Sequence, residues 1–195
     1  MSLSPRNFRN LKTTMASLGR LLFAGIGFLI LVAAVGAQTR VGRPATDDKI
    51  KAMDLTVMPN GDGLPAGKGN AAEGKSIYKE KCATCHNDKM EGRPGQYPAL
   101  VGGIGSISTP KPAKTVGSYW PYATTVFDYI RRAMPYDQPG SLSNDEVYSL
   151  VAAILNGNGI IGDNDEMNKD SLANVKMPNR ENFVLDARPD VKSKR

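Results

Sequence analysis

Both cysteines and the single histidine of this chain lie in one segment, Cys82-Ala83-Thr84-Cys85-His86. Two thiols separated by two residues and followed at once by an imidazole match the attachment of haem c. In that chemistry, the sulfurs form thioethers with the haem vinyl groups and the histidine ligates the iron. A redox dithiol would favour a preceding strand in a βαβ unit, and zinc would need a fourth ligand. The sequence shows neither, so we expect one covalent haem held by Cys82 and Cys85, with His86 as the proximal ligand.

The sixth iron ligand follows by elimination. Because His86 is the only histidine, ligation by two histidines of this chain is excluded. Methionine is the usual alternative and raises the reduction potential. The methionines after the motif are Met90, Met134, Met167 and Met177. Met90 is too close in sequence to reach the opposite haem face, whereas Met134 ends a predicted helix that Pro135 stops. We expect Met134 to be the distal ligand, with Met177 as the main competitor and core packing as the alternative role.

Two further residues are expected near the haem. The carbonyl of Pro98 is the predicted acceptor for the other ring N–H of His86, unless Pro98 belongs to an ordinary surface turn. Trp120, the only tryptophan, either donates its indole N–H to a haem propionate or packs against the ring. Several lysines bracket the motif and either steer an acidic redox partner or are ordinary surface lysines. They are Lys75, Lys79, Lys81 and Lys89.

Three helices are expected to position these groups. The first begins at Gly69 or Asn70 and runs to about Cys82, and the second runs from about Pro121 to Met134. The third begins at the capping box Ser143–Glu146 and closes at Asn156-Gly157. Residues 87–117 are rich in glycine, proline, serine and lysine and are expected to form loops. No strand pattern is visible, which predicts an all-α domain with long loops around the haem.

The first 37 residues have the pattern of a secretory signal peptide, here called the leader. A basic start without acidic residues precedes the uncharged run Leu21–Val35, and small residues suited to signal peptidase follow. A membrane anchor over residues 21–37 is the alternative, although the run is short for a span. Both readings place the rest of the chain in the periplasm. We divide that remainder into a linker or N-terminal arm (38–67), a haem domain (68–157) and a C-terminal extension (158–195).

The formal net charge of +6 overstates the basic character of the mature protein. Arg6, Arg9, Lys12 and Arg20 lie in the leader, and the remaining basic and acidic residues nearly balance. The two propionates of a haem would bring the charge closer to zero. The composition therefore gives no argument for nucleic-acid binding.

The order of these features resembles the class I cytochrome c family. Gly74 and Tyr78 lie in the first helix, the haem motif follows, and Pro98-x-Leu100, Met134-Pro135 and a last helix come after it. The resemblance covers roughly residues 68–157 and implies the class I cytochrome c-like fold and electron transfer. One departure is that Ala152 and Ala153 stand where the family has an aromatic residue packing on the first-helix glycine. Tyr148 is the candidate replacement.

Four further segments look like the cytochrome subunit of sulfite dehydrogenases and the haem subunit of the Sox sulfur dehydrogenase. They are Ser118–Ala123, Arg131–Pro135, Asn158–Gly162 and Met177–Arg180. This resemblance implies an electron-transfer subunit that is not itself an enzyme. Its donor would be a molybdopterin sulfite-oxidase-like subunit, and its acceptor a downstream cytochrome or oxidase. Some members of the Sox group carry a second haem, whereas this chain has one CxxCH motif.

Other functions stay open at the level of sequence. The alternatives are a general electron shuttle to a terminal oxidase, and a haem enzyme or sensor with an open iron site if Met134 does not bind. The C-terminal extension either wraps the domain or presents its few apolar residues to a partner.

Overall fold

The computed structural model describes residues 42–184, so the predicted leader and the basic C-terminal end lie outside the described part. The chain divides into two compact units after Ile50. Helix α2 (Asp47–Met53) lies at this division, and none of its residues is buried. This short helix lies within the segment predicted as a linker or N-terminal arm, and it was not predicted from the sequence. Acidic residues in the first turn and the Thr46 hydroxyl, which accepts from the Lys49 N–H at 3.4 Å, favour the helix.

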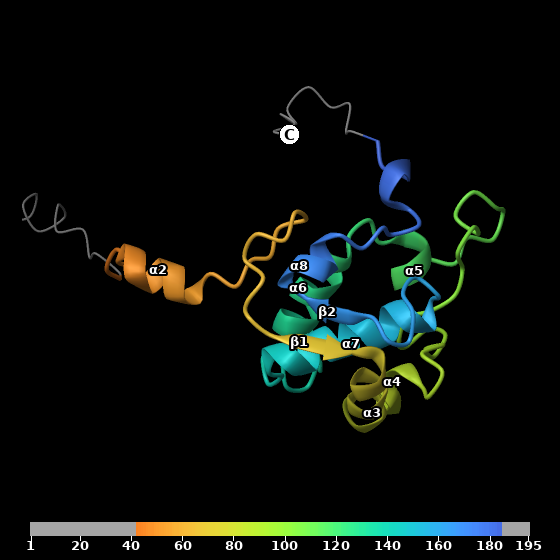
Figure 1. The fold of residues 1–195 in the computed structure, drawn as a ribbon, viewed down its shortest axis with the longest axis horizontal. Helices are drawn as coiled ribbons and strands as arrows, with labels where there is room; N and C mark the ends of the chain where they lie inside the picture. The colour runs from red at the N-terminus through yellow and green to blue at the C-terminus, as the bar shows by residue number, and fades with distance from the viewer. Residues whose placement is uncertain (1–41, 185–195) are drawn as a thin grey trace, which may run out of the picture. The chain divides into compact units, whose positions relative to one another are not determined.

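The second unit is built around helix α7 (Asn144–Gly157), whose residues Val147–Leu155 are all buried. Such a helix must be covered on every side. Helices α3 (Ala71–Lys81) and α6 (Ala123–Ala133) pack against it, as Figure 1 shows. The capping box at its start is present as predicted, since the Ser143 hydroxyl accepts from the Glu146 N–H and the Glu146 carboxylate accepts from the Ser143 N–H.

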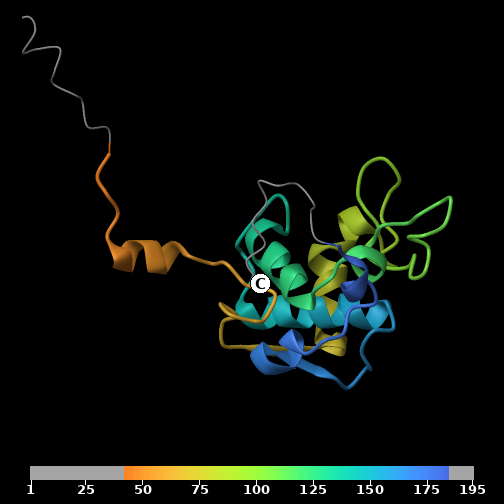
Figure 2. The ribbon, with the colours of Figure 1, turned by 90° about the horizontal axis from the view of Figure 1, so that it is seen from above.

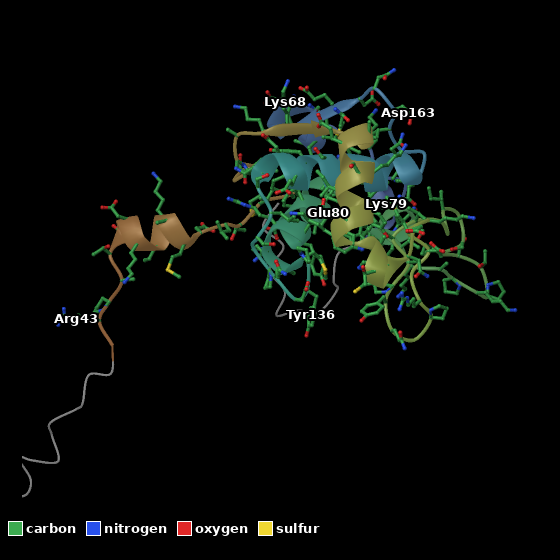
Figure 3. The ribbon with its side chains drawn as sticks, turned by 90° about the horizontal axis from the view of Figure 1, so that it is seen from below. Arg43, Lys68, Lys79, Glu80, Tyr136 and Asp163 are labelled. Carbon is green, nitrogen blue, oxygen red and sulfur yellow. The ribbon has the colours of Figure 1, made fainter. Side chains whose placement is uncertain are left out.

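Helix α3 crosses α7 with close backbone contact (Figure 3). It begins at the predicted cap, where the Asn70 side chain accepts from the Glu73 N–H at 3.0 Å. A Cβ placed on Gly74 would overlap the Ser149 carbonyl and lie 2.9 Å from the Ala153 Cβ. The small residues of α7 therefore face Gly74, and no aromatic ring is needed there.

Tyr148 does not take the place of the missing aromatic. Its ring packs on Phe127 of α6 with 4.5 Å between ring centroids. Its hydroxyl donates to the Pro65 carbonyl at 2.9 Å, which ties the segment before α3 to the core. Tyr148 therefore contributes to the contact between α6 and α7, whereas Gly74 and Ala153 lie in the contact between α3 and α7.

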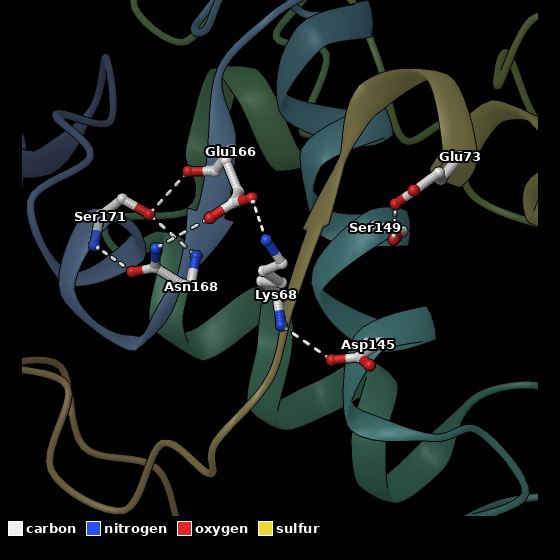
Figure 4. A network of polar contacts seen from close by, with 7 residues as sticks. All are labelled: Lys68, Glu73, Asp145, Ser149, Glu166, Asn168 and Ser171. Carbon is white, nitrogen blue, oxygen red and sulfur yellow. Dashed lines mark hydrogen bonds and ion pairs between the residues drawn. The ribbon is translucent and has the colours of Figure 1, made fainter.

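The unit is mostly helical but contains a small sheet that we did not predict. Strand β1 (Lys68–Asn70) pairs antiparallel with β2 (Glu166–Asn168), with Gly69 opposite Met167. Two strands of three residues are too short to display an alternating pattern, and they are far apart in sequence. The Lys68–Glu166 ion pair at 3.0 Å supports the pairing (Figure 4). The Lys68 N–H also donates to Asp145 of α7 at 2.8 Å.

The described part of the C-terminal extension packs on the helices of the second unit through several buried side chains. It contains β2, helix α8 (Lys169–Ala173) and the 3-10 turn η1 (Arg180–Asn182), none of which was predicted. Asn168 caps α8 through bonds from the Asp170 and Ser171 N–H groups. The apolar side chains of Met167, Leu172 and Met177 in the extension are buried. The described extension therefore wraps the domain.

The segment between the haem motif and α7 also differs in part from the prediction. Loops run from α4 (Ala83–His86) to α5 (Val116–Tyr119) and extend from one side of the unit (Figure 2). The short helix α5 was not expected; Thr115 and Ser118 cap it reciprocally. Helix α6 begins at Ala123 because Tyr122 is extended, so Pro121 precedes the helix instead of opening it. Within residues 42–184, no helix is long and apolar enough to cross a membrane.

Candidate haem-binding site

The two cysteines lie where α3 ends and the chain turns into α4. The Cys82 N–H still donates to the Tyr78 carbonyl at 2.8 Å, as in the helix before it. The Cys82 carbonyl then accepts from both the Cys85 and the His86 N–H groups, at 3.1 and 3.0 Å. These bonds form one tight turn, which places the two half-buried thiols and the imidazole close together in the fold.

The environment of Cys82 is unlike that of an activated thiol. Burial, and secondarily the neighbouring Cys85, raise the pKa of the Cys82 thiol to about 11. A redox dithiol and a zinc site both need a thiolate, which a lowered pKa supplies. Among the described residues, no group of three or more Cys, His, Asp or Glu side chains could hold a metal ion. Both observations disfavour the two alternatives to haem.

The His86 ring is oriented by the turn that follows the motif. Its Nδ1 lies 2.9 Å from the Pro98 carbonyl oxygen. Because a carbonyl only accepts, Nδ1 carries the proton and Nε2 keeps the lone pair that an iron ligand needs. The Gly92 N–H donates to the His86 carbonyl at 2.9 Å and closes the turn from the other side.

The four methionines after the motif differ in their surroundings. Met90, Met167 and Met177 are core residues with exposed fractions of 7, 4 and 4%. Met134 is half-buried at the end of α6, where its N–H donates to the Ile130 carbonyl at 3.1 Å. Of these four side chains, Met134 alone reaches the margin of the core.

The residues present suit a haem group. A haem is a flat, largely apolar macrocycle that needs apolar walls beside its covalent and iron ligands. Partly buried apolar side chains from α3, α4, α6, the connecting loops and the extension pack against the core. They include Ile77, Ala83, Leu100, Val101, Trp120, Met134, Ile160 and Ile161. Trp120 packs edge-on against Tyr129, with 5.7 Å between ring centroids.

Two of the four lysines that bracket the motif are paired within the protein. Lys81 lies 3.0 Å from Glu146, and Lys75 lies 3.4 Å from Asp163. Lys79 and Lys89 are exposed, and Figure 3 shows Lys79 beside Glu80 on α3. Much of the positive charge seen in the sequence is therefore compensated locally.

Sequence reasoning missed Arg93. Its guanidinium donates from Nη2 to the Thr84 carbonyl at 2.8 Å and from Nε to the Asn87 side-chain oxygen at 3.1 Å. Thr84 lies between the two cysteines, so a residue of the following loop holds the motif directly. An exposed arginine in a glycine- and proline-rich segment gives no signal of this role.

A protein-family model and a solved structure both match this chain. The family model of subunit III of the cbb3-type cytochrome c oxidase matches residues 69–152. In the crystal structure of the sulfane dehydrogenase SoxCD from Paracoccus pantotrophus, one chain is similar with a TM-score of 0.70 and 40% identity, over 78% of this chain and 75% of that one. The chain is a class I c-type cytochrome.

Curated relatives match a shorter part of the cytochrome. A thiosulfate dehydrogenase of Stutzerimonas stutzeri is 32% identical over 96 residues, which are 47% of this chain and 28% of that protein. The cbb3-type cytochrome c oxidase subunit CcoP of an Azospirillum species is 36% identical over 66 residues, which are 33% of this chain and 20% of the relative. The cytochrome thus spans less than a third of the length of these two relatives. Membership of the cytochrome c family implies covalently bound haem c.

Proposed function

We propose that this cytochrome is a monohaem electron-transfer subunit that accepts electrons from a molybdenum-containing sulfite or sulfur dehydrogenase in the periplasm. The similarity to the sulfane dehydrogenase structure carries this proposal, because it extends over 78% of the chain at 40% identity. The haem domain of residues 68–157 is less than half of the chain, so the similarity includes more than that domain. The match to a thiosulfate dehydrogenase adds a second relative that acts on a sulfur compound.

In this proposal each residue of the site has a defined role. Cys82 and Cys85 hold the haem by thioether bonds, His86 is the proximal ligand and Met134 the distal ligand. The geometry of the motif turn and the position of Met134 at the margin of the core support these assignments. The haem would supply one-electron chemistry, and the protein would bind it and orient the imidazole through Pro98.

The proposed domain organisation follows from the same function. Residues 1–37 export the chain, either as a cleaved signal or as a retained anchor over residues 21–37. Residues 38–67 form the arm, 68–157 hold the haem, and 158–195 form the extension. The partners are a molybdopterin sulfite-oxidase-like subunit as donor and a downstream cytochrome or oxidase as acceptor. The protein makes no bond to the sulfur substrate itself.

Haem content is the first test. The full chain, produced with the cytochrome c maturation machinery, is expected to give a pyridine haemochrome of haem c with one haem per chain. It should also show a reduced-minus-oxidised difference spectrum. The Cys82→Ser, Cys85→Ser double variant serves as the control and should lose the covalent attachment. Wild-type protein without covalent haem c would contradict the proposal.

A second candidate is a general electron shuttle to a terminal oxidase. The family match over residues 69–152 and the CcoP relative favour it, because both concern the cbb3-type oxidase. Anaerobic mixing separates the two candidates. Reduction of the ferric cytochrome by a molybdenum sulfite-oxidase-like enzyme and its substrate supports the dehydrogenase role. Oxidation of the ferrous form by oxidase-containing membranes, without reduction by the molybdenum enzyme, supports the shuttle.

A further inference from the structure

The loop after the haem motif is a small hairpin that ends at Pro98. The Arg93 N–H donates to the Tyr97 carbonyl at 2.8 Å, and the Tyr97 N–H donates back to the Arg93 carbonyl at 2.9 Å. Gly95, with φ of +79°, forms the turn between them. The next residue is Pro98, whose carbonyl accepts from His86. The position of this acceptor therefore depends on how the hairpin is attached to the motif.

The side chain of Arg93 makes that attachment. Its two bonds reach the carbonyl of Thr84, inside the motif, and the side chain of Asn87, directly after it. The Asn87 amide in turn donates to the Gly92 carbonyl at 2.8 Å, and the Asn87 carbonyl accepts from the buried Tyr78 hydroxyl at 2.9 Å. One guanidinium thus links both ends of the turn that contains His86.

We propose that Arg93 is a positioning residue that fixes the hydrogen bond between His86 Nδ1 and the Pro98 carbonyl. This inference rests on the proposed role of His86 as the proximal ligand. Arg93 belongs through its backbone to the hairpin that carries Pro98, and through its side chain to the turn that carries His86. A rigid planar fork that engages two acceptors at once holds these two parts in one relative position.

The bond that Arg93 fixes controls the electronic character of the imidazole. An Nδ1–H that donates firmly to a carbonyl makes the ring a better electron donor to iron, which favours the ferric state. Loosening the bond therefore raises the reduction potential. The positive charge of Arg93 has the opposite effect from the hydrogen bond and raises the reduction potential, since a nearby cation favours the ferrous state. Replacement by lysine keeps the charge and removes the fork, so it isolates the positioning effect.

The experiment compares the haem-loaded wild type with Arg93→Lys, Arg93→Gln and the control Lys89→Gln. Lys89 is an exposed cation three residues after His86, and the control removes a charge near the motif without removing a bond to it. Nuclear magnetic resonance of the diamagnetic ferrous protein measures how fast the His86 ring N–H exchanges with solvent. A redox titration measures the midpoint potential of each variant.

We expect the ring N–H to exchange about tenfold faster in both Arg93 variants, as for the loss of one charge-assisted hydrogen bond. The midpoint potential of Arg93→Lys should rise, and the exchange rate of Lys89→Gln should stay within twofold of wild type. An exchange rate in Arg93→Lys within twofold of wild type would overturn the inference, as would equally fast exchange in Lys89→Gln. If Arg93→Gln does not retain haem, Arg93→Lys decides the result alone.

This outcome is separable from failure of the proposed function. Failure of the cytochrome to accept electrons from a molybdenum enzyme leaves the ring N–H measurement unaffected. Wild-type protein without haem, or with a ligand other than His86, refutes the proposed site itself. Only the comparison among haem-loaded variants tests Arg93.

Discussion

His86 is held from three directions before any iron is considered. The Cys82 carbonyl accepts from its N–H, the Gly92 N–H donates to its carbonyl, and the Pro98 carbonyl accepts from its ring. These bonds fix the backbone, the ring orientation and the tautomer together. A ligand fixed in this way needs little rearrangement when the iron gains or loses an electron, which suits an electron carrier.

Glu146 gives a residue-scale prediction about pH. Bonds from Ser143 and Lys81 lower the pKa of this carboxyl below its usual value of 4.5. A lowered pKa in the folded state stabilises the fold above the unfolded pKa, and this stabilisation is lost as pH falls through the folded pKa. Glu146→Gln should therefore reduce the free energy of unfolding by about 1 kcal/mol at pH 7, with a difference that shrinks below about pH 4.

Urea denaturation at several pH values measures this difference. Glu80→Gln is the matched control, because Glu80 is an exposed acid on α3 and should change stability by less than about 0.5 kcal/mol. A Glu146→Gln effect that is the same at pH 3 and pH 7 would show that the carboxylate charge is not responsible.

The candidate site could be predicted from sequence where covalent chemistry fixes the spacing. Two thiols and an imidazole within five residues permit few chemistries, so the motif alone predicts Cys82, Cys85 and His86 as the residues that hold the haem, and these assignments stay predictions. Met134 required elimination, and its place as distal ligand stays a prediction. Arg93 could not be found, because its role depends on a long side chain folding back from a loop whose path the sequence does not specify.

At the scale of elements, the crossing of α3 and α7 positions the motif. Gly74 allows the two backbones to approach each other at Ser149. Cys82 lies about two helical turns after Gly74, at the C-terminal cap of α3. Tyr78, one turn beyond Gly74, is buried and holds the Asn87 carbonyl behind the motif. Helix contact and site geometry therefore depend on the same face of α3.

Gly74→Ala tests this contact. The added methyl would overlap the Ser149 carbonyl, which is backbone and cannot rotate away. We expect a loss of about 3 kcal/mol in the free energy of unfolding, despite the better helix propensity of alanine. Ser76→Ala, at an exposed position of α3, should be neutral within about 0.5 kcal/mol. Chemical denaturation measures both variants, and equal stability of Gly74→Ala and wild type would contradict the close approach.

Long helices with capping signals were the predictable elements. Asn70 and the Ser143–Glu146 box mark the starts of α3 and α7 in sequence and in structure. The strands β1 and β2 could not be predicted, because each gains its partner only after the extension has folded back. Helix α8 was missed for a related reason: it is five residues long and depends on the cap Asn168 and the buried Leu172.

For the whole molecule, the extension is part of the fold as far as the described residues reach. Leu172 and Met177 are buried in the same core as α6 and α7. The Asn179 side chain donates to the Tyr119 carbonyl at 2.9 Å, and Phe183 packs edge-on against Tyr119. Tyr119 directly precedes Trp120, so the extension supports the segment expected to lie near the haem.

The proposed electron transfer requires a haem with both axial positions filled. The alternative is an open iron site with peroxidase or gas chemistry, and Met134 decides between them. Its half-buried position at the end of α6 supports the closed site, while Met177 is buried in the core.

The most direct measurement is the absorption spectrum of the oxidised protein, which shows a methionine-to-iron charge-transfer band when a methionine sulfur binds ferric iron. If Met134 is the distal ligand, this band is present in the wild type and in Met177→Leu, a volume-conserving control, and is lost in Met134→Leu. A wild type without the band, or a band that survives Met134→Leu and disappears in Met177→Leu, would show that Met134 does not bind the iron.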